Sequence, residues 1–233
     1  RGDPGGAGSG TRATFASGFT GPGSPGLSDT IDSIAIHSLG NAADFGDLTA
    51  ARMRVSGMGN STRGICAGGK TPTYLNTLDY WTIATAGDAA DFGDLTESKD
   101  ALFCVSSPTR GLSAGGNTGS RSDVIDYVTI ASAGDATDFG DLSVIKHSCA
   151  SASSSTRGVI FSGRDAPSDT LLNVIEYITI ASTGDATDFG DLLTGMRQSN
   201  AMSNRIRGVT GGGNPATDTM EYITIASTGD AAD

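Results

Sequence analysis

The chain has 233 residues, of which 37% are hydrophobic and 6% aromatic, and it contains 34 glycines and 7 prolines. A core interrupted by many tight turns is typical of β-rich proteins, and β-propellers and barrels of this length commonly form one domain. The net charge of −11 and the pI near 4.4 would repel a phosphate backbone or an anionic lipid surface, so we expect neither a nucleic-acid nor a membrane partner.

No stretch approaches the roughly 18 to 20 consecutive apolar residues of a membrane-spanning helix. The opening sequence RGDPGGAGSG also lacks the apolar run of a signal peptide, so we expect a soluble protein. The three cysteines, Cys66, Cys104 and Cys149, are odd in number and have no CxxC spacing, which disfavours a zinc site or a complete disulfide framework. We expect them to be small buried hydrophobic residues, and we expect no metal and no cofactor.

The chain is built on an internal repeat with a period of about 47 residues. The string DFGDL begins at Asp44, Asp91, Asp138 and Asp188, and Asp233 stands where a fifth copy would begin. A fixed period of roughly 20 to 50 residues is the signature of repeat architectures, in which each unit packs on its neighbours. The sequence therefore predicts about five copies of one unit in a single repeat domain over residues 1–233, with units cut at both ends.

Each unit predicts four short strands. The first is the segment that ends near Val55, Phe103 or Ala150. The second begins at a repeated arginine, as in RGICAGG from Arg63, and ends in a glycine pair that can adopt positive φ. The third is a run such as LDYWTI from Leu78, which is rich in residues that favour strands. Its lack of polar alternation indicates a strand covered on both faces.

The fourth predicted strand is DFGDL, which supplies one large apolar side chain in each complete copy. These side chains are Phe45, Phe92, Phe139 and Phe189. Because the four phenylalanines share one offset in the unit, we expect each to be buried between neighbouring units.

The order of a glycine pair, a tyrosine and, after a loop, a phenylalanine resembles the kelch repeat, with Phe where kelch units usually have Trp. The tyrosines are Tyr80, Tyr127, Tyr177 and Tyr222, and Ser33 stands at this place in the first copy. WD40 units are disfavoured because no Gly-His or Trp-Asp dipeptide occurs. The resemblance implies an all-β fold, a β-propeller of about five four-stranded kelch-like blades. Five periods would nearly close a ring, and a longer native chain fits equally well.

The phrase YITIASTGDATDFGDL, from Tyr177, is similar to repeats in structural proteins of marine bacteriophages. This resemblance implies a virion protein of the tail or the capsid surface. We therefore expect a non-enzymatic structural or adhesive module whose partners are other virion proteins, a protein or glycan surface, or copies of itself. Two alternatives stay open: an intracellular kelch-type scaffold for protein interaction, and a propeller enzyme that acts on polysaccharides.

The loop after the glycine pair carries all the variation in length between units. Its copies are Phe19 to Thr30, Lys70 to Thr77, Asn117 to Val124, Arg164 to Val174 and Asn214 to Thr219. In a propeller this loop shares a rim with the connections between blades, and variable loops on a rigid scaffold commonly carry binding. The candidate binding residues are Phe19, Tyr74, Arg121, Arg164 and Asp165.

Charged residues also recur with the repeat. An acid stands in every third strand (Asp32, Asp79, Asp126, Glu176, Glu221), and an arginine begins every second strand (Arg12, Arg63, Arg110, Arg157, Arg207). One hypothesis is that these acids and arginines pair blade by blade, which would be a structural role.

Aspartates cluster around each DFGDL string at three-residue spacing, as in Asp88, Asp91 and Asp94. Clustered carboxylates suit calcium, but the alternate spacing and fixed glycine of known calcium loops are missing. We expect these side chains to accept hydrogen bonds from backbone N–H groups in tight turns.

Catalytic signals are weak. The two histidines, His37 and His147, occupy non-equivalent places in their units, and no Ser or Cys constellation accompanies either of them. A propeller enzyme would need titratable groups that break the repeat at one end of the ring, whereas most of the acids follow it. We therefore expect no enzymatic activity and no catalytic residues.

Overall fold

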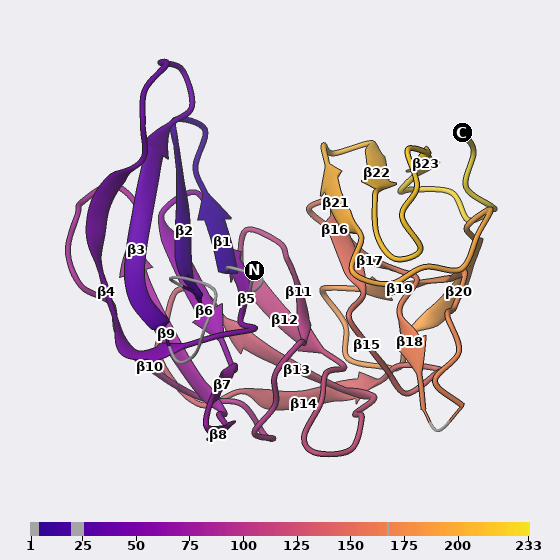
Figure 1. Ribbon diagram of the computed structural model, residues 1–233, viewed down its shortest axis with the longest axis horizontal. Coiled ribbons are helices and arrows are strands. Elements are labelled where there is room, and N and C mark those ends of the chain that lie inside the picture. The colour runs from indigo at the N-terminus through magenta and orange to yellow at the C-terminus, as the bar shows by residue number, and fades with distance from the viewer. Residues whose placement is uncertain (1–4, 20–25, 167) are drawn as a thin grey trace.

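The computed structural model describes residues 5–19, 26–166 and 168–233, apart from the side chain of Phe19. Every regular element in these ranges is a β-strand, and the five main sheets are antiparallel. The sheets follow one another around an arc as the blades of a β-propeller (Figure 1). The predicted all-β propeller of about five blades is confirmed.

In each blade the strands lie side by side in chain order, with the first strand on the inside of the arc and the last on the outside. The first contains β1 (Gly5–Gly8), β2 (Arg12–Phe19), β3 (Leu27–Ala35) and β4 (Ala43–Arg52). The second contains β5 (Ser56–Gly59), β6 (Arg63–Ala67), β9 (Thr77–Thr82) and β10 (Ala90–Asp94). The third contains β11 (Phe103–Ser106), β12 (Arg110–Ala114), β13 (Val124–Thr129) and β14 (Thr137–Asp141).

The fourth blade contains β16 (Ala150–Ser153), β17 (Arg157–Phe161), β19 (Val174–Thr179) and β20 (Thr187–Asp191). The fifth contains β21 (Asn200–Ser203), β22 (Arg207–Gly211) and β23 (Met220–Thr224), and a bridge between Tyr222 and Ala232 takes the place of its fourth strand. Two small ribbons lie outside the blades. They pair β7 (Lys70–Thr71) with β8 (Thr73–Tyr74), and β15 (Lys146–His147) with β18 (Arg164–Asp165).

The position predicted for the first strand of each unit is wrong by several residues. The innermost strands begin at Ser56, Phe103 and Ala150, which is where the sequence prediction has them end or nearly end. The preceding segments are linkers between blades instead. One of these linkers carries Lys99, which is buried against the next blade, whereas in the first blade the strand β4 extends as far as the equivalent residue, Arg52.

A β-bulge recurs where the outermost strand pairs with the third strand. Ile125 pairs with Gly140 and Asp126 with Asp138, so Phe139 has no partner in the register. The same shift skips Phe45, Phe92 and Phe189 in their blades. A bulge re-aims the side chain of the extra residue, and here that residue is the repeated phenylalanine.

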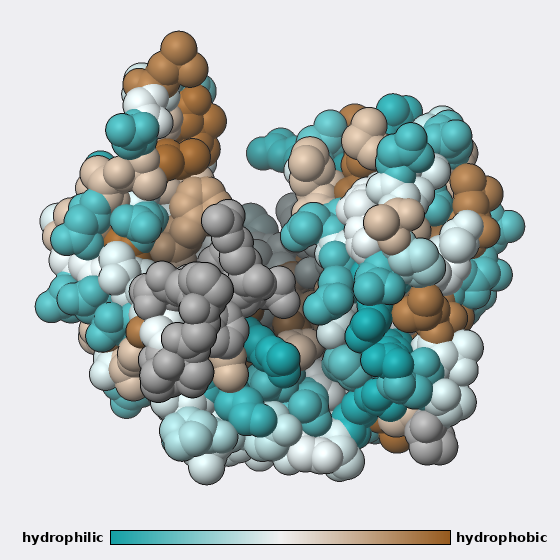
Figure 2. Space-filling view, viewed as in Figure 1, coloured by the Kyte–Doolittle hydropathy of each residue, from teal (hydrophilic) through white to brown (hydrophobic). Residues whose placement is uncertain are grey.

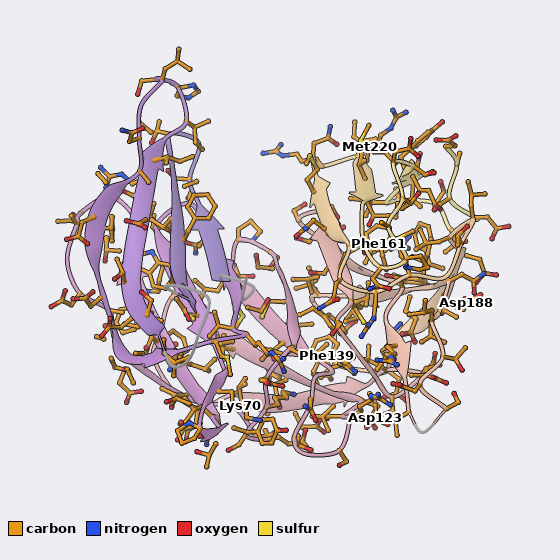
Figure 3. The ribbon with its side chains drawn as sticks, in the orientation of Figure 1. Lys70, Asp123, Phe139, Phe161, Asp188 and Met220 are labelled. Carbon is orange, nitrogen blue, oxygen red and sulfur yellow. The ribbon has the colours of Figure 1, made fainter. Side chains whose placement is uncertain are left out.

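The core lies between blades. The four phenylalanines are buried, as predicted, and each belongs to an apolar cluster that joins its own blade to the next one. Figure 3 marks Phe139, which packs with Ile160 and Ile178 of the fourth blade. In the three middle blades the phenylalanine also meets the repeated tyrosine edge-on, with ring centroids 5.7 to 6.1 Å apart. Such T-shaped pairs add stability beyond the burial of apolar area.

The first and last blades do not pack on each other as the interior blades do. Figure 2 shows a deep notch between them, and Figure 1 places β1 and β21 on its two sides. Met202 is 74% exposed, whereas Met58 at the same place in the second blade is 3% exposed. Phe15 and Met220 are also exposed, so the described residues leave one apolar blade face uncovered at each end of the arc.

Candidate functional site

The variable loops lie on the same rim as the linkers between blades, as predicted. Gly69, at the start of one loop, donates its N–H to the carbonyl of Lys99 in the next linker at 2.9 Å. Leu75 and Asn76 accept hydrogen bonds from the N–H groups of Lys99 and Leu95 at 3.0 and 2.8 Å. Because both kinds of segment share these backbone bonds, the loops are anchored at their bases to a rigid framework.

Tyr74 connects two neighbouring loops of this rim. It belongs to the ribbon β7–β8, it is half-buried, and its hydroxyl accepts a hydrogen bond from Nδ2 of Asn117 at 3.2 Å. The ammonium of Lys70 lies 4.3 Å from the centre of its ring. Lys70 and Asp123, from these two loops, both lie at the lower edge of the molecule in Figure 3.

Arg121, Arg164 and Asp165 come together at the next pair of loops. Both guanidinium groups form ion pairs with the carboxylate of Asp169, and Arg121 also donates to the carbonyl of Asp165 at 2.5 Å. The side chain of Asp165 accepts from Ser168 Oγ at 2.5 Å and from the N–H of Thr170 at 2.6 Å. These hydrogen bonds, that from Ser168 most of all, lower the pKa of the Asp165 carboxyl.

The structure therefore brings four of the five predicted residues into two adjoining clusters. Arg121 forms a backbone bridge with Asn117, whose side chain contacts Tyr74, so the two clusters are continuous. The backbone of Phe19 pairs with Leu27 at the end of β2, but its side chain lies outside the described residues. The sequence did not indicate Asn117 or Asp169, because their contacts with Tyr74, Arg121 and Arg164 depend on how neighbouring loops lie against one another.

His147 lies in β15, which pairs with the strand β18 of the same rim, and its Nδ1 lies 2.7 Å from Ser148 Oγ. Burial lowers the pKa of its imidazole to about 4, and the positive charges of Arg121 and Arg164 add to this shift. The ring is therefore neutral at pH 7. His37, by contrast, is exposed in the turn after β3.

No protein-family model matches the chain, and a search of curated proteins found no match. Among the described residues, no group of three or more His, Cys, Asp or Glu side chains is placed to hold a metal ion. The same part of the chain contains no helix with the length and apolar character needed to cross a membrane.

The hypothesis that the repeated arginines pair with the repeated acids is wrong. Each arginine lies over an aromatic ring of its own blade, with 4.1 to 5.6 Å between the guanidinium carbon and the ring centre. Four of them also donate to a backbone carbonyl of the following blade, as Arg63 does to Ile130 at 2.8 Å. In the first blade, where Ser33 replaces the tyrosine, Arg12 lies over Phe45.

Three of the five repeated acids pair instead with a cation from the end of the preceding blade or from the segment that follows it. The pairs are Arg52 with Asp79 at 3.0 Å, Lys99 with Asp126 at 3.1 Å and Lys146 with Glu176 at 2.5 Å. All six side chains are fully buried. A signal for these pairs is present in the sequence, because each cation stands eight residues after the first Asp of its DFGDL string. The sequence analysis did not identify it because the residue at this position is Arg in one unit and Lys in two others, and the comparison of units considered identical residues only.

The aspartates of the turns accept backbone hydrogen bonds, as predicted. Asp91 accepts one within its own string, from the N–H of Gly93 at 3.2 Å, but most of these bonds run between blades. Asp88, Asp135, Asp185 and Asp230 each accept from the N–H of the last Asp in the preceding blade's DFGD string, at 3.0 to 3.1 Å. Burial and neighbouring carboxylates raise the pKa of Asp141 at one of these contacts. The acidic turns are thus part of the attachment between blades.

The cysteines are free, and burial raises the pKa of each thiol, to about 12 for Cys104 and Cys149. Cys66 and Cys104 are buried, as predicted, and Cys149 is partly buried. A protonated thiol is a poor nucleophile and a poor metal ligand, so these side chains serve packing.

Proposed function

We propose that the chain is a non-enzymatic structural or adhesive module of a phage virion, on the tail or the capsid surface, that binds through its variable loops. One observation carries the proposal: a constant blade framework confines all variation in length to one rim, and side chains of neighbouring loops contact one another there. A rigid framework with variable loops at one edge suits recognition.

The rim offers groups that suit a protein or glycan surface. The guanidinium groups of Arg121 and Arg164 are partly exposed and retain N–H donors beyond those that contact Asp169. Tyr74 adds a half-buried aromatic ring to the same surface. Arginine and tyrosine are enriched among the residues that dominate binding energy at protein interfaces. The partners that we propose are host-surface proteins or glycans, neighbouring virion proteins and further copies of the chain.

Binding of the purified chain to host-cell surfaces and to a glycan array tests the display role. The double change Arg121→Ala and Arg164→Ala should reduce binding at least about tenfold, since each lost charged hydrogen bond typically costs about 1.5 to 3 kcal/mol. Thr85 lies in an exposed turn on the opposite rim, so the control variant Thr85→Ala should bind like the wild type. Equal loss in both variants would overturn the assignment of the binding rim.

The virion assignment needs a separate measurement, because loop binding alone does not establish it. Mass spectrometry of purified phage particles should detect the chain among the structural proteins. Capture of one defined intracellular protein, together with absence from particles, would favour the interaction-scaffold alternative. Cleavage of a polysaccharide by the wild-type chain would favour the enzyme alternative.

A further inference from the structure

The interface between the fourth and fifth blades lacks the buried cation found at the other three. Met196 occupies the linker position that Lys146 occupies one blade earlier. The backbones at the two positions are held alike: Gly163 donates to the carbonyl of Met196 at 2.9 Å, and Gly116 donates to that of Lys146 at 3.2 Å. A methionine thus stands at a place where this fold otherwise buries a positive charge.

The acid at this interface is retained and is held as its equivalents are. Glu221 is 1% exposed, and its Oε2 accepts the N–H of Leu193 at 2.7 Å. Glu176 accepts the N–H of Ser143 at 2.8 Å in the same way, but it also has Lys146 beside it. No cationic side chain of the described residues lies within 4.0 Å of the Glu221 carboxylate.

A cavity of about 330 Å³ opens beside this carboxylate. Its lining includes Leu193, Met196, Pro215, Thr217, Glu221 and Asp233. The variable loop of the fifth blade supplies Pro215 and Thr217, so the cavity belongs to the loop rim. It combines apolar walls, hydroxyl groups and a buried carboxylate that has a backbone donor but no positive charge.

We propose that this cavity binds an alkylammonium group, with the ammonium against Glu221 and the alkyl chain along Met196 and Leu193. A buried carboxylate is costly without a positive partner, and a bound ammonium offsets that cost as Lys146 does for Glu176. The donor set favours an organic cation over calcium, which takes six to eight oxygen ligands. The ammonium can come from a free amine or from a lysine side chain of a partner protein. The inference does not depend on the virion assignment.

Titration of the whole chain with n-butylammonium chloride, followed by NMR and calorimetry, tests the proposal. Binding should be saturable and at least about tenfold tighter than that of n-butanol, which has the same chain length without the charge, because a hydrogen bond between charged groups is stronger than one between neutral groups. Equal binding of the alcohol, or binding of calcium chloride but not of the amine, would overturn it.

Two changes at Met196 separate the site from general effects on folding. Met196→Lys supplies an ammonium from the chain itself and should abolish binding of n-butylammonium, while the fold tolerates it because Lys99 and Lys146 occupy the same position in other blades. The matched change Met196→Leu keeps the site apolar and should bind within about twofold of the wild type. Unchanged affinity in the lysine variant would contradict the proposal.

Glu221→Gln provides an independent check and should weaken binding at least about tenfold, since it removes the charge and keeps the shape. A tripeptide with a central lysine, capped at both ends, distinguishes the two sources of the ammonium when it is compared with its norleucine counterpart. Tighter binding of the lysine peptide than of n-butylammonium supports a partner's side chain. Binding of the small amine with exclusion of the peptide supports a free amine.

Discussion

At the scale of single residues, the glycine of each DFGD string is required by the neighbouring blade. A Cβ on Gly140 would lie 2.6 Å from the backbone of Gly184, which belongs to a turn of the fourth blade. The φ of Gly140 is +147°, in a region that side chains rarely allow. Close approach of the two backbones allows Gly184 to donate its N–H to the carbonyl of Phe139 at 2.8 Å.

We predict that Gly140→Ala destabilises the fold by more than the roughly 1 to 3 kcal/mol of backbone strain alone, because the methyl group also meets the neighbouring backbone. Urea unfolding of the variant and the wild type measures the change in the free energy of unfolding. Gly40→Ala is the control, since a Cβ at Gly40 would meet nothing within 4 Å. Similar unfolding midpoints for the two variants would contradict the role assigned to the contact between blades.

The second prediction at this scale concerns His147. Burial and the charges of Arg121 and Arg164 hold its pKa near 4, against 6.5 in an ordinary histidine. Because the folded state resists protonation, this residue contributes stability that is complete above pH 6.5 and is lost as the pH falls from 6.5 toward 4. NMR titration of the imidazole should give a midpoint well below 6, and Arg121→Gln should raise it. A midpoint at 6.5 or above in the wild type would disprove the assignment.

At the scale of the strand, the bulge determines what each outermost strand contributes. Its extra residue is the repeated phenylalanine, which enters the cluster shared with the next blade. Phe139 is buried there and meets Tyr127 edge-on at 5.8 Å. The ribbon β7–β8, in contrast, contributes the half-buried ring of Tyr74 to the loop rim.

Phe139→Ala should cost about 3 to 5 kcal/mol of unfolding free energy, as truncation of a buried phenylalanine usually does. Tyr74→Ala should cost only about 1 kcal/mol, mainly the hydrogen bond from Asn117. Thermal and urea unfolding of both variants make the comparison. If Phe139→Ala melted like the wild type while Tyr74→Ala did not, the assignment of Phe139 to the core and of Tyr74 to the binding rim would be contradicted.

At the scale of the whole molecule, the same kind of apolar interface joins each of the four pairs of neighbouring blades. Among the described residues, the first and the last blade each have one apolar face that no other blade covers. The third residue of each innermost strand shows this directly. Met58 packs against Gly111 of the next blade, whereas Met202 at the equivalent position is largely exposed. In repeat proteins stability is approximately a sum of units and nearest-neighbour interfaces, so equivalent side chains need not contribute equally.

Met58→Ala should therefore destabilise the chain by about 2 to 5 kcal/mol. Met202→Ala makes the same chemical change at the same repeat position and should stay within about 0.5 kcal/mol of the wild type, as surface substitutions usually do. Equilibrium unfolding of the pair at matched protein concentrations provides the measurement. Equal destabilisation would show that Met202 is covered in solution, and sedimentation would then show whether a second copy covers it.

Much of the blade could be predicted because the same sequence pattern occurs in several copies of the unit. The strand from Arg110, the strand from Val124 and the burial of Phe139 follow from local residue preferences that recur in every unit. The start of the innermost strand was not predicted, because its sequence differs from blade to blade: the strands SGMG, FCVS, ASAS and NAMS share no motif. Of the candidate site, the rim and its loops were predictable, whereas the contacts of Arg121 and Arg164 with Asp169 were not.

The sequence by itself determined the period, the second, third and fourth strands of each complete unit and the rim on which length varies, because these depend on spacing and on local preferences of the chain. The tertiary structure decided the partners of the charged groups. Asp126 pairs with Lys99, and Arg110 lies over Tyr127, because packing of one blade on the next buries the linker cation beside the acid. Which charges meet across an interface depends on distances between separate blades, and a repeated letter in the sequence does not encode them.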